Sequence, residues 1–481
     1  MRDFVPEPLF SLAAALKKET GKPLYLIGGK VRDYLAGFSM ASSDFDICAP
    51  VPAEIFMKTA LAAGFCADAA YARTGTMKIS LRQNGGNEKN DIKAEAEYAA
   101  FRSDKYVRGT HTPAETFFTE DILLDARRRD FTCNAVYYDI VADTFVDPLG
   151  GMKDIRNKLL RTVDKPGKVF GEDGLRLLRL ARFAGATGFS PTPETLDGAK
   201  NNAALIADVS PERIFAELKQ ILCSERKYGN ADGIYQALEI LDETRVLDGI
   251  FPDLAAGRNL KQRADFHNHD VLEHSLRAAA YSARANALAG VFPGIPVPFD
   301  VRLAALLHDI GKPAAYFRDG KFSDHPNVGA VLARVALEKL KAPVKTIKLV
   351  EALTKYHMYD YDLCTKENKL RKFIVLHYDI FNELLLVKQA DFSACKDDFS
   401  TAPGVTRLKN LADKMRAEGA PFTLKELAVR GNEIAPLLPS SRYVGTTLEA
   451  LLLHCAVTPA DNTKERLLRL APSFGIVGGK N

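Results

Sequence analysis

Residues 24–33 read LYLIGGKVRD, and the stretch SDFDI follows at residues 43–47. In the first stretch a short apolar run meets two glycines and then a helix-forming segment, which predicts a buried strand, a tight turn and a helix in that order. The second stretch predicts another strand. Because Gly28 and Gly29 have no side chains, the backbone there can approach a phosphate closely, and the free N–H groups at the helix start favour an anion.

The residues around these stretches also mix strand and helix signals. Residues 76–81 alternate apolar and polar side chains, as a half-buried strand does, and residues 94–101 can pair back on them. After Gly150-Gly151 the strand signals become few, and leucine, alanine, arginine and glutamate recur at helical spacing. The fold class that follows is α+β, with an N-terminal α/β head that contains a small mixed sheet and a remainder that is all-α.

Length and composition limit the class of protein. The chain has 481 residues, enough for about three domains, and its 47% hydrophobic and 26% charged residues are typical of a soluble folded protein. The net charge of +4 permits a local basic groove. Seven dispersed cysteines without a CxxC pair argue against a disulfide framework, and no run approaches the ~20 apolar residues that cross a bilayer. We therefore expect a cytoplasmic protein that has no membrane partner.

Carboxylates near the glycine turn indicate a metal site. Asp44 and Asp46 are two apart on an expected strand, so both side chains project from one face. Oxygen ligands of this kind hold Mg²⁺, which can steady the attacking and leaving oxygens of a phosphoryl or nucleotidyl transfer. A third carboxylate comes from residues 94–101, where Glu95 and Glu97 share a face, so the strand period does not choose between them.

Further motifs follow one another in the head and the adjoining helical segment: LIGGKVRD (26–33), SDFDI (43–47), EYAAFR (97–102), RRRDFTCNAVYYD (127–139), DPLGGMKDI (147–155) and FGEDGLRLLRLARFAG (170–185). In this order they resemble the class II tRNA CCA-adding nucleotidyltransferases and the related bacterial poly(A) polymerases. The resemblance implies a nucleotidyltransferase head and a helical neck and body.

The same resemblance implies a role for individual residues. Asp44, Asp46 and Glu97 would be the catalytic carboxylates, and Asp44 and Asp46 would hold Mg²⁺. Arg129 and Asp130 would contact the ribose, and Asp173 with Arg176 would select the base without a nucleic-acid template. The nucleotide-binding residues in full would be Gly28, Gly29, Arg32, Arg129, Asp130, Asp173, Arg176 and Arg179.

Elementary chemistry agrees with the base-selecting role. Asp173 and Arg176 are three residues apart on an expected helix and would lie on one face. A carboxylate accepts from an amino group and a guanidinium donates to a ring acceptor. Cytosine and adenine both carry an amino group beside a ring acceptor, whereas uracil and guanine present a carbonyl and a ring donor there.

A second set of metal-type side chains lies between residues 266 and 396, within a helical block. Its members are His274, His308, Asp309, His325, His357 and Asp391. With HDIGKP at 308–313, this set resembles the HD phosphohydrolase superfamily. The resemblance implies His274, His308, Asp309 and Asp391 as ligands, with His325 and His357 available for a second ion. Imidazole-rich sites favour Mn, Fe, Ni or Zn over Mg.

The expected domain order is a nucleotidyltransferase head (1–150), a neck and body that select the base and contact tRNA (151–255), an HD domain (256–400) and a helical tail (401–481). Residues 102–113 stand where the family has a flexible loop that helps the enzyme change from C to A addition, and residues 424–471 resemble the tail that grips tRNA.

The sequence thus predicts an enzyme that adds CCA to the 3′ end of tRNA from CTP and ATP, with a possible phosphatase or 2′,3′-cyclic phosphodiesterase activity in the HD domain and no DNA partner. The alternatives are a poly(A) polymerase or an enzyme that adds only A. A further alternative is an HD phosphohydrolase whose head only binds nucleotide. The sequence does not predict the oligomeric state.

Overall fold

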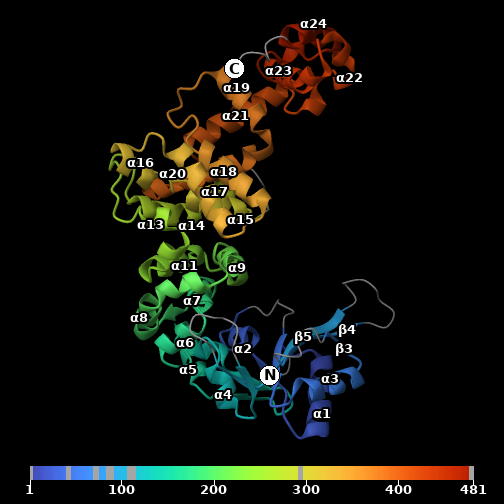
Figure 1. Ribbon diagram of the computed structural model, residues 1–481, viewed down its shortest axis with the longest axis vertical. Coiled ribbons are helices and arrows are strands. Elements are labelled where there is room, and N and C mark those ends of the chain that lie inside the picture. Colours follow the sequence, from blue (N-terminus) through green and yellow to red (C-terminus); the bar gives the residue numbers. More distant parts are fainter. Residues whose placement is uncertain are drawn as a thin grey trace. The chain divides into compact units, whose positions relative to one another are not determined.

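The computed structural model describes residues 4–38, 45–68, 75–82, 92–105, 115–290 and 296–475. The chain divides into two compact units, Met1–Pro252 and Asp253–Asn481 (Figure 1). The first unit holds a mixed sheet and the second is helical, so the expected α+β class is confirmed. The finer division into four segments stays a prediction.

The strands of the first unit are, in chain order, β1 (Tyr25–Ile27), β2 (Phe45–Ala49), β3 (Cys66–Asp68), β4 (Thr76–Arg82), β5 (Ile92–Ala100), β6 (Arg102–Lys105), β7 (Glu115–Phe118), β8 (Tyr137–Asp139), β9 (Thr144–Val146), β10 (Leu159–Leu160) and β11 (Ser190–Pro191). Its helices are α1 (Glu7–Thr20), α2 (Gly29–Leu35), α3 (Ala53–Ala62), α4 (Ile122–Arg127), α5 (Gly151–Arg156), α6 (Pro166–Glu172), α7 (Leu175–Thr187), α8 (Pro193–Asn201), α9 (Pro211–Ile221), α10 (Glu225–Tyr228), α11 (Gly233–Glu243) and α12 (Val246–Ile250).

Seven of the described strands form one sheet in the order β3-β4-β5-β2-β1-β8-β9. Strands β2 and β5 are parallel, and the other neighbours are antiparallel. Helices α1 and α3 pack on each other and on this sheet. The strands expected from the sequence at residues 24–27, 45–48, 76–81 and 94–101 are confirmed, and β4 does pair back on β5. The sequence analysis did not identify α3, β8 or β9.

The turn after β1 requires glycine at one position. Gly28 has a φ of 75°, a backbone conformation that side chains with a Cβ rarely adopt. A Cβ built there would also lie only 3.0 Å from the Asp46 carboxylate. Gly28 therefore lets the start of α2 approach the carboxylate of β2, which brings the two motifs of the head together.

The helical neck follows the sheet within the same unit. Helix α7 packs against α9 and α11. The contact with α11 is close because Gly185 and Gly233 face one another, and a Cβ on either would lie 2.3 Å from the carbonyl oxygen of the other. This close crossing fixes the helix that carries Arg176 and Arg179. The short parallel pair β10–β11 is a departure from the all-α neck that the sequence predicted.

The second unit contains α13 (which starts at Pro252 in the first unit and runs to Ala255), α14 (Val271–Ala289), α15 (Phe299–Leu307), α16 (Lys312–Asp319), α17 (His325–Lys339), α18 (Val344–Tyr356), α19 (Glu367–Leu376), α20 (Phe381–Lys396), α21 (Pro403–Ala417), α22 (Gly431–Ile434), α23 (Val444–Val457) and α24 (Lys464–Gly475). Helices α14, α15, α17, α18 and α20 pack together, and α19 connects this group to α21 and α23. Within the described part of the chain, no helix has both the length and the apolar character that a membrane span requires.

Candidate functional site

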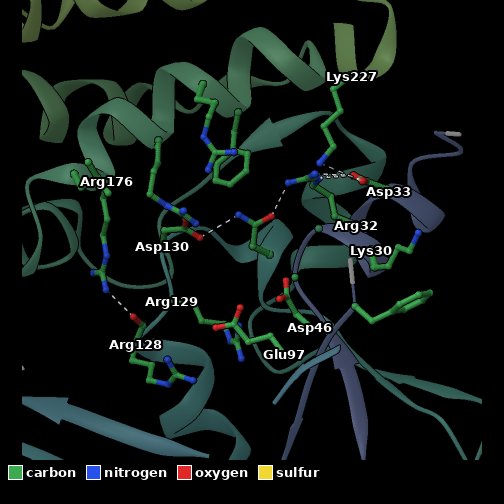
Figure 2. A pocket seen from close by; sticks show the side chains of 18 of the residues that line it. Lys30, Arg32, Asp33, Asp46, Glu97, Arg128, Arg129, Asp130, Arg176 and Lys227 are labelled. Carbon is green, nitrogen blue, oxygen red and sulfur yellow. Dashed lines mark hydrogen bonds and ion pairs between the residues drawn. The ribbon is translucent and has the colours of Figure 1, made fainter. Parts of the chain in front are cut away.

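A polar cavity of about 740 Å³ lies in the first unit, between the glycine turn, the sheet and helix α7. Its lining contains these predicted residues: Gly28, Gly29, Arg32, Asp46, Glu97, Arg129, Asp130, Asp173, Arg176 and Arg179. Figure 2 shows Asp46 and Glu97 next to one another, with Arg129 close by. Arginine and lysine outnumber carboxylates in the lining, which suits a polyanionic ligand. Asp44 lies outside the described residues.

The carboxylates sit at matching positions on two neighbouring strands. Asp46 on β2 is the register partner of Glu97 on the parallel strand β5, and both side chains are exposed to the cavity. Glu95 lies two residues away and faces Lys78, with 3.7 Å between Nζ and Oε1. The register therefore favours Glu97 as the partner of Asp46, a choice that the strand period alone left open.

These carboxylates fit a hard divalent ion. Asp46 and Glu97 present oxygen atoms on one side of the sheet, the donor type that Mg²⁺ prefers. Gly28 leaves space beside Asp46 that a side chain would fill.

A buried aspartate that the sequence analysis did not single out organises the arginines. The carboxylate of Asp125 is fully buried and accepts hydrogen bonds from Arg128 Nε (2.7 Å), Arg129 Nη2 (3.0 Å) and the Tyr137 hydroxyl (2.7 Å). Its other contact is the backbone N–H of Arg102, at 3.3 Å. Burial by itself would raise the pKa of Asp125, but Arg129 and Arg128 lower it to about 2. Asp125 is therefore an anion that holds Arg129 at the cavity wall.

Asp130 is held in a similar way. It accepts from Arg179 Nε at 2.8 Å and Nη2 at 2.6 Å, from Asn134 at 3.1 Å, and from the backbone N–H of Phe131 at 2.8 Å. Burial would raise the pKa of Asp130, whereas Arg179 and the hydrogen bonds hold it below its ordinary value. Asp130, predicted to contact the ribose, and Arg179, predicted to bind the nucleotide, therefore form one ion pair whose carboxylate is buried and whose guanidinium is partly exposed.

Arg32 is buried and fully engaged by neighbouring side chains, unlike a phosphate ligand at the surface. Its side chain is 1% exposed and donates to Asp33 (2.6 Å), Asn134 (2.9 Å) and the Tyr228 hydroxyl (2.8 Å). Tyr228 lies on α10, so the network joins the GGxVRD turn to the helical neck. Arg32 thus lines the cavity and also connects the head to the helical neck.

The prediction that Asp173 and Arg176 lie on one helix is wrong. Helix α6 ends at Glu172 and α7 starts at Leu175, so Asp173 lies in extended backbone between them. The break has two physical causes: the Asp173 carboxylate accepts the Leu175 N–H at 3.0 Å, and Gly174 lies so close to a neighbouring segment that a Cβ would be 2.5 Å from the carbonyl oxygen of Leu205.

The two base-selecting candidates consequently have separate partners. Asp173 Oδ2 lies 3.3 Å from Arg213 Nη2. Arg176 is 6% exposed and donates to the carbonyl oxygens of Val169 (2.9 Å) and Arg128 (2.6 Å). Both residues still line the cavity, Asp173 from the break between the helices and Arg176 from the first turn of α7.

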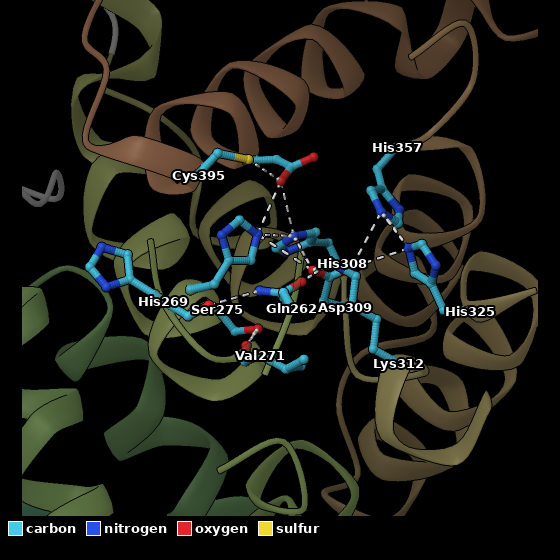
Figure 3. Close-up of polar contacts among 12 residues, drawn as sticks. Gln262, His269, Val271, Ser275, His308, Asp309, Lys312, His325, His357 and Cys395 are labelled. Atoms are coloured by element: carbon cyan, nitrogen blue, oxygen red, sulfur yellow. Dashed lines mark hydrogen bonds and ion pairs between the residues drawn. The ribbon is translucent and has the colours of Figure 1, made fainter. Parts of the chain in front are cut away.

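All six predicted HD residues converge in the second unit, and Figure 3 labels four of them, His308, Asp309, His325 and His357. His274 lies on α14, His308-Asp309 follows α15, His325 opens α17, His357 ends α18 and Asp391 lies on α20. His274 Nε2 is 3.1 Å from both His308 Nε2 and Asp391 Oδ1. Around the second aspartate, His325 Nε2 and His357 Nε2 lie 3.2 and 3.6 Å from Asp309 Oδ1.

These donors fit a transition-metal ion. Asp309 is 1% exposed and neither carboxylate oxygen has a hydrogen bond of good geometry, although imidazole nitrogens surround it. Burial would raise the pKa of Asp309 and of Asp391, but His308 lowers both well below the ordinary value, so both are anions. Lys312 Nζ lies 2.5 Å from Asp309 Oδ2 and 2.6 Å from Gln262 Oε1, which makes it a neighbour of the ligands.

Two further metal-type side chains lie beside these six residues. His267 and Cys395 offer ligand atoms that lie, with one of His274, within 4.8 Å of each other. The sequence held a signal for Cys395, because it follows Asp391 by four residues and so shares its helix face. His269 instead pairs with Asp397 at 3.3 Å.

Comparison with known proteins gives three family matches along the chain. Residues 24–161 match the poly A polymerase head domain, residues 188–257 match the probable RNA and SrmB-binding site of polymerase A, and residues 271–391 match the HD domain.

Relatives match over most of the chain. An A-adding tRNA nucleotidyltransferase of Deinococcus radiodurans is 30% identical over 467 residues, covering 94% of this chain and 92% of that protein. A multifunctional CCA protein of Acinetobacter baumannii is 30% identical over 346 residues, covering 70% and 74%. A crystal structure of the Bacillus stearothermophilus CCA-adding enzyme in complex with CTP has the same fold, with a TM-score of 0.65, 24% identity, and coverage of 97% of this chain and 96% of that one.

Proposed function

The chain belongs to the class II tRNA nucleotidyltransferase family and carries an HD domain, and from this premise we propose that it rebuilds the 3′-terminal CCA of tRNA from CTP and ATP and releases pyrophosphate. Both of its catalytic-type domains come from metal-dependent families. The observation that carries the proposal is the single cavity in which a carboxylate pair, a basic wall and the Asp173–Arg176 segment meet.

The carboxylate end of the cavity would bind the reacting groups. Asp46 and Glu97, with Asp44 as a further carboxylate, would hold Mg²⁺. When bound there, Mg²⁺ supplies charge neutralisation at the triphosphate and at the terminal hydroxyl of the RNA. Gly28 and Gly29 bring backbone N–H groups to the same end, where a phosphate is a suitable ligand.

The opposite end would choose the nucleotide. Asp130 and Arg129 would contact the ribose, and each is held by an ion pair, with Arg179 and Asp125 respectively. Asp173 would accept from the amino group of C or A, and Arg176 would donate to the adjacent ring acceptor. Arg176 donates to the carbonyl oxygens of Val169 and Arg128 and to the Glu172 carboxylate, and these bonds would hold its guanidinium in place beside the base.

A second candidate is addition of A alone to a tRNA that already ends in CC. The observation that favours it is the extent of the match: the A-adding relative aligns with 94% of this chain, including the tail, whereas the multifunctional CCA relative aligns with 70%. A poly(A) polymerase is the third candidate because its head shares the same motifs.

One experiment separates these candidates. Purified protein is incubated with Mg²⁺, CTP and ATP and with two tRNA transcripts, one ending at the discriminator base and one ending in CC, and the 3′ ends are sequenced. CCA ends on both transcripts support the proposal. Growth of the CC transcript alone assigns A addition, and runs of A assign polyadenylation. Protein carrying Asp46→Asn, purified in parallel, is the control for contaminating enzymes.

We also propose that the HD centre hydrolyses phosphoesters at damaged RNA ends, as a phosphatase or 2′,3′-cyclic phosphodiesterase. Support comes from the convergence of all six predicted ligands. His308→Ala should abolish both the opening of a 2′,3′-cyclic phosphate at an RNA end and the release of inorganic phosphate from an RNA 3′-phosphate. Nucleotide addition should be unchanged, and the Tm shows whether the variant is folded. Hydrolysis that survives in this variant would assign the activity to another site. Hydrolysis without any nucleotide addition would favour an HD phosphohydrolase with a nucleotide-binding head.

A further inference from the structure

The ligand imidazoles of the HD centre are not equivalent. In His308, His325 and His357 the Nδ1 atom contacts the carbonyl oxygen three residues earlier, at 2.8, 2.6 and 2.7 Å. Such a contact fixes the tautomer and directs Nε2 to the centre. His274 is the exception, since it is fully buried and its Nδ1 has no hydrogen-bond partner.

His274 packs against a second histidine whose Nδ1 has no hydrogen-bond partner. The rings of His267 and His274 are perpendicular, with centroids 4.9 Å apart, and the buried Nδ1 of His267 also lacks a partner. Because buried polar atoms nearly always have a partner, two such atoms on neighbouring rings indicate that a ligand is expected there.

A thiol completes this side of the centre. Cys395 Sγ lies 3.9 Å from Asp391 Oδ1, which is itself 3.1 Å from His274 Nε2. The backbone N–H of Asn268 donates to the carbonyl oxygen of Cys395 at 2.9 Å, which holds the segment carrying His267 against the end of α20. In Figure 3, Cys395 lies on the other side of His308 from His357.

We propose that His267, His274 and Cys395 form a sulfur-containing metal position that shares His274 with the six predicted HD ligands and is selective for a thiophilic divalent cation such as Zn²⁺. The three ligand atoms lie within 4.8 Å of one another, a spacing that one ion can bridge after small side-chain movements. Binding converts the Cys395 thiol to a thiolate, and the proton leaves to solvent. The fourth position of a tetrahedral ion is left for water or an oxygen of a substrate.

This inference goes beyond the proposed functions because it concerns which metal the centre holds and does not require hydrolysis to occur. Thiolate ligands select softer ions than an imidazole and carboxylate set does. The chain would therefore keep Zn²⁺ under conditions in which the six predicted ligands alone exchange Mn²⁺ or Fe²⁺.

Cobalt reports the sulfur ligand directly. The full-length protein is stripped with a chelator, dialysed and titrated with Co²⁺ alone, and its absorption is recorded. We expect a thiolate-to-cobalt charge-transfer band in the near ultraviolet. Cys395→Ser should remove this band and lower Zn²⁺ affinity by at least about tenfold, and His267→Ala should weaken Zn²⁺ binding in the same direction.

Two controls keep the test decisive. Cys364→Ser removes an exposed thiol of the same unit and should leave the band unchanged. His325→Ala removes a predicted ligand on the far side of Asp309 and should also retain it. Absence of the band in the wild-type protein, or its persistence in Cys395→Ser with an unchanged Tm, would overturn the proposal.

Discussion

Arg179 donates two hydrogen bonds to one oxygen of Asp130, from Nε at 2.8 Å and from Nη2 at 2.6 Å. Asp130 comes from the RRD motif of the head, and Arg179 comes from helix α7 of the neck. The pair therefore joins two motifs that the sequence presents separately, and it fixes the carboxylate that faces the nucleotide ribose in the proposed function.

Arg179→Lys should impair nucleotide addition because lysine cannot supply both donors from one planar group. Losing one charge-assisted hydrogen bond costs about 1.5–3 kcal/mol, so kcat/KM should fall by about tenfold or more, with weaker discrimination against 2′-deoxynucleotides. The control is Arg161→Lys, which alters the ion pair with Asp154 outside the cavity. Equal effects of the two substitutions on kcat/KM would contradict the role of the Asp130 pair.

Glu97 and Glu95 give a matched test on one strand. Both side chains are exposed, so neither substitution should change the free energy of unfolding by more than about 0.5 kcal/mol. Glu97→Gln should reduce kcat by about a hundredfold or more because a ligand of the metal is lost, whereas Glu95→Gln should remain within a few fold of wild type. Steady-state addition assays over a range of Mg²⁺ concentrations measure both. A larger loss in the Glu95 variant would reverse the assignment.

Asp173→Ala should relax the choice of base. The substitution removes the acceptor for the amino group of C or A, so discrimination against UTP and GTP should fall by about tenfold or more. Competition assays with pairs of nucleotides measure this ratio independently of the overall rate. Asp164→Ala, which removes a partly exposed carboxylate paired with Lys168 outside the cavity, serves as the control. Unchanged selectivity in the Asp173 variant would remove it from base selection.

Asp125→Asn should destabilise the protein in a pH-dependent manner. The folded pKa of about 2 lies below the unfolded value of ~3.9, so the ionised carboxylate stabilises the fold above about pH 4 and this contribution is lost as the pH falls toward 2. At pH 7 the variant should lose about 2 kcal/mol, and its difference from wild type should shrink below about pH 4. Urea unfolding at pH 7, 5 and ~3.5 measures the difference. A gap that stays constant with pH would show that the carboxylate charge is not the cause.

Local patterns were sufficient for much of the head and for the HD ligands. The strands β1, β2, β4 and β5 were predicted because a buried or half-buried strand leaves a short-range pattern of apolar residues. The HD residues were found because each is of a metal-binding type and they recur within one helical block. Strand β8 was missed because it has only three residues, and α3 was missed because its exposed Ile55 and Leu61 obscure the apolar face that Phe56 and Ala60 form.

What the sequence determined by itself is the order of chemical groups: the glycine turn, the carboxylates, the RRD and EDGLR motifs, and the histidine–aspartate set. Only the tertiary structure decided which of them meet. The pairing of β2 with β5 places Glu97 opposite Asp46, the contact of Gly174 with Leu205 breaks the expected helix at Asp173, and the packing of residue 268 on α20 brings His267 to Cys395. The physical reason is that a periodic pattern specifies which face a residue occupies, whereas its neighbour across the face depends on how distant segments pack.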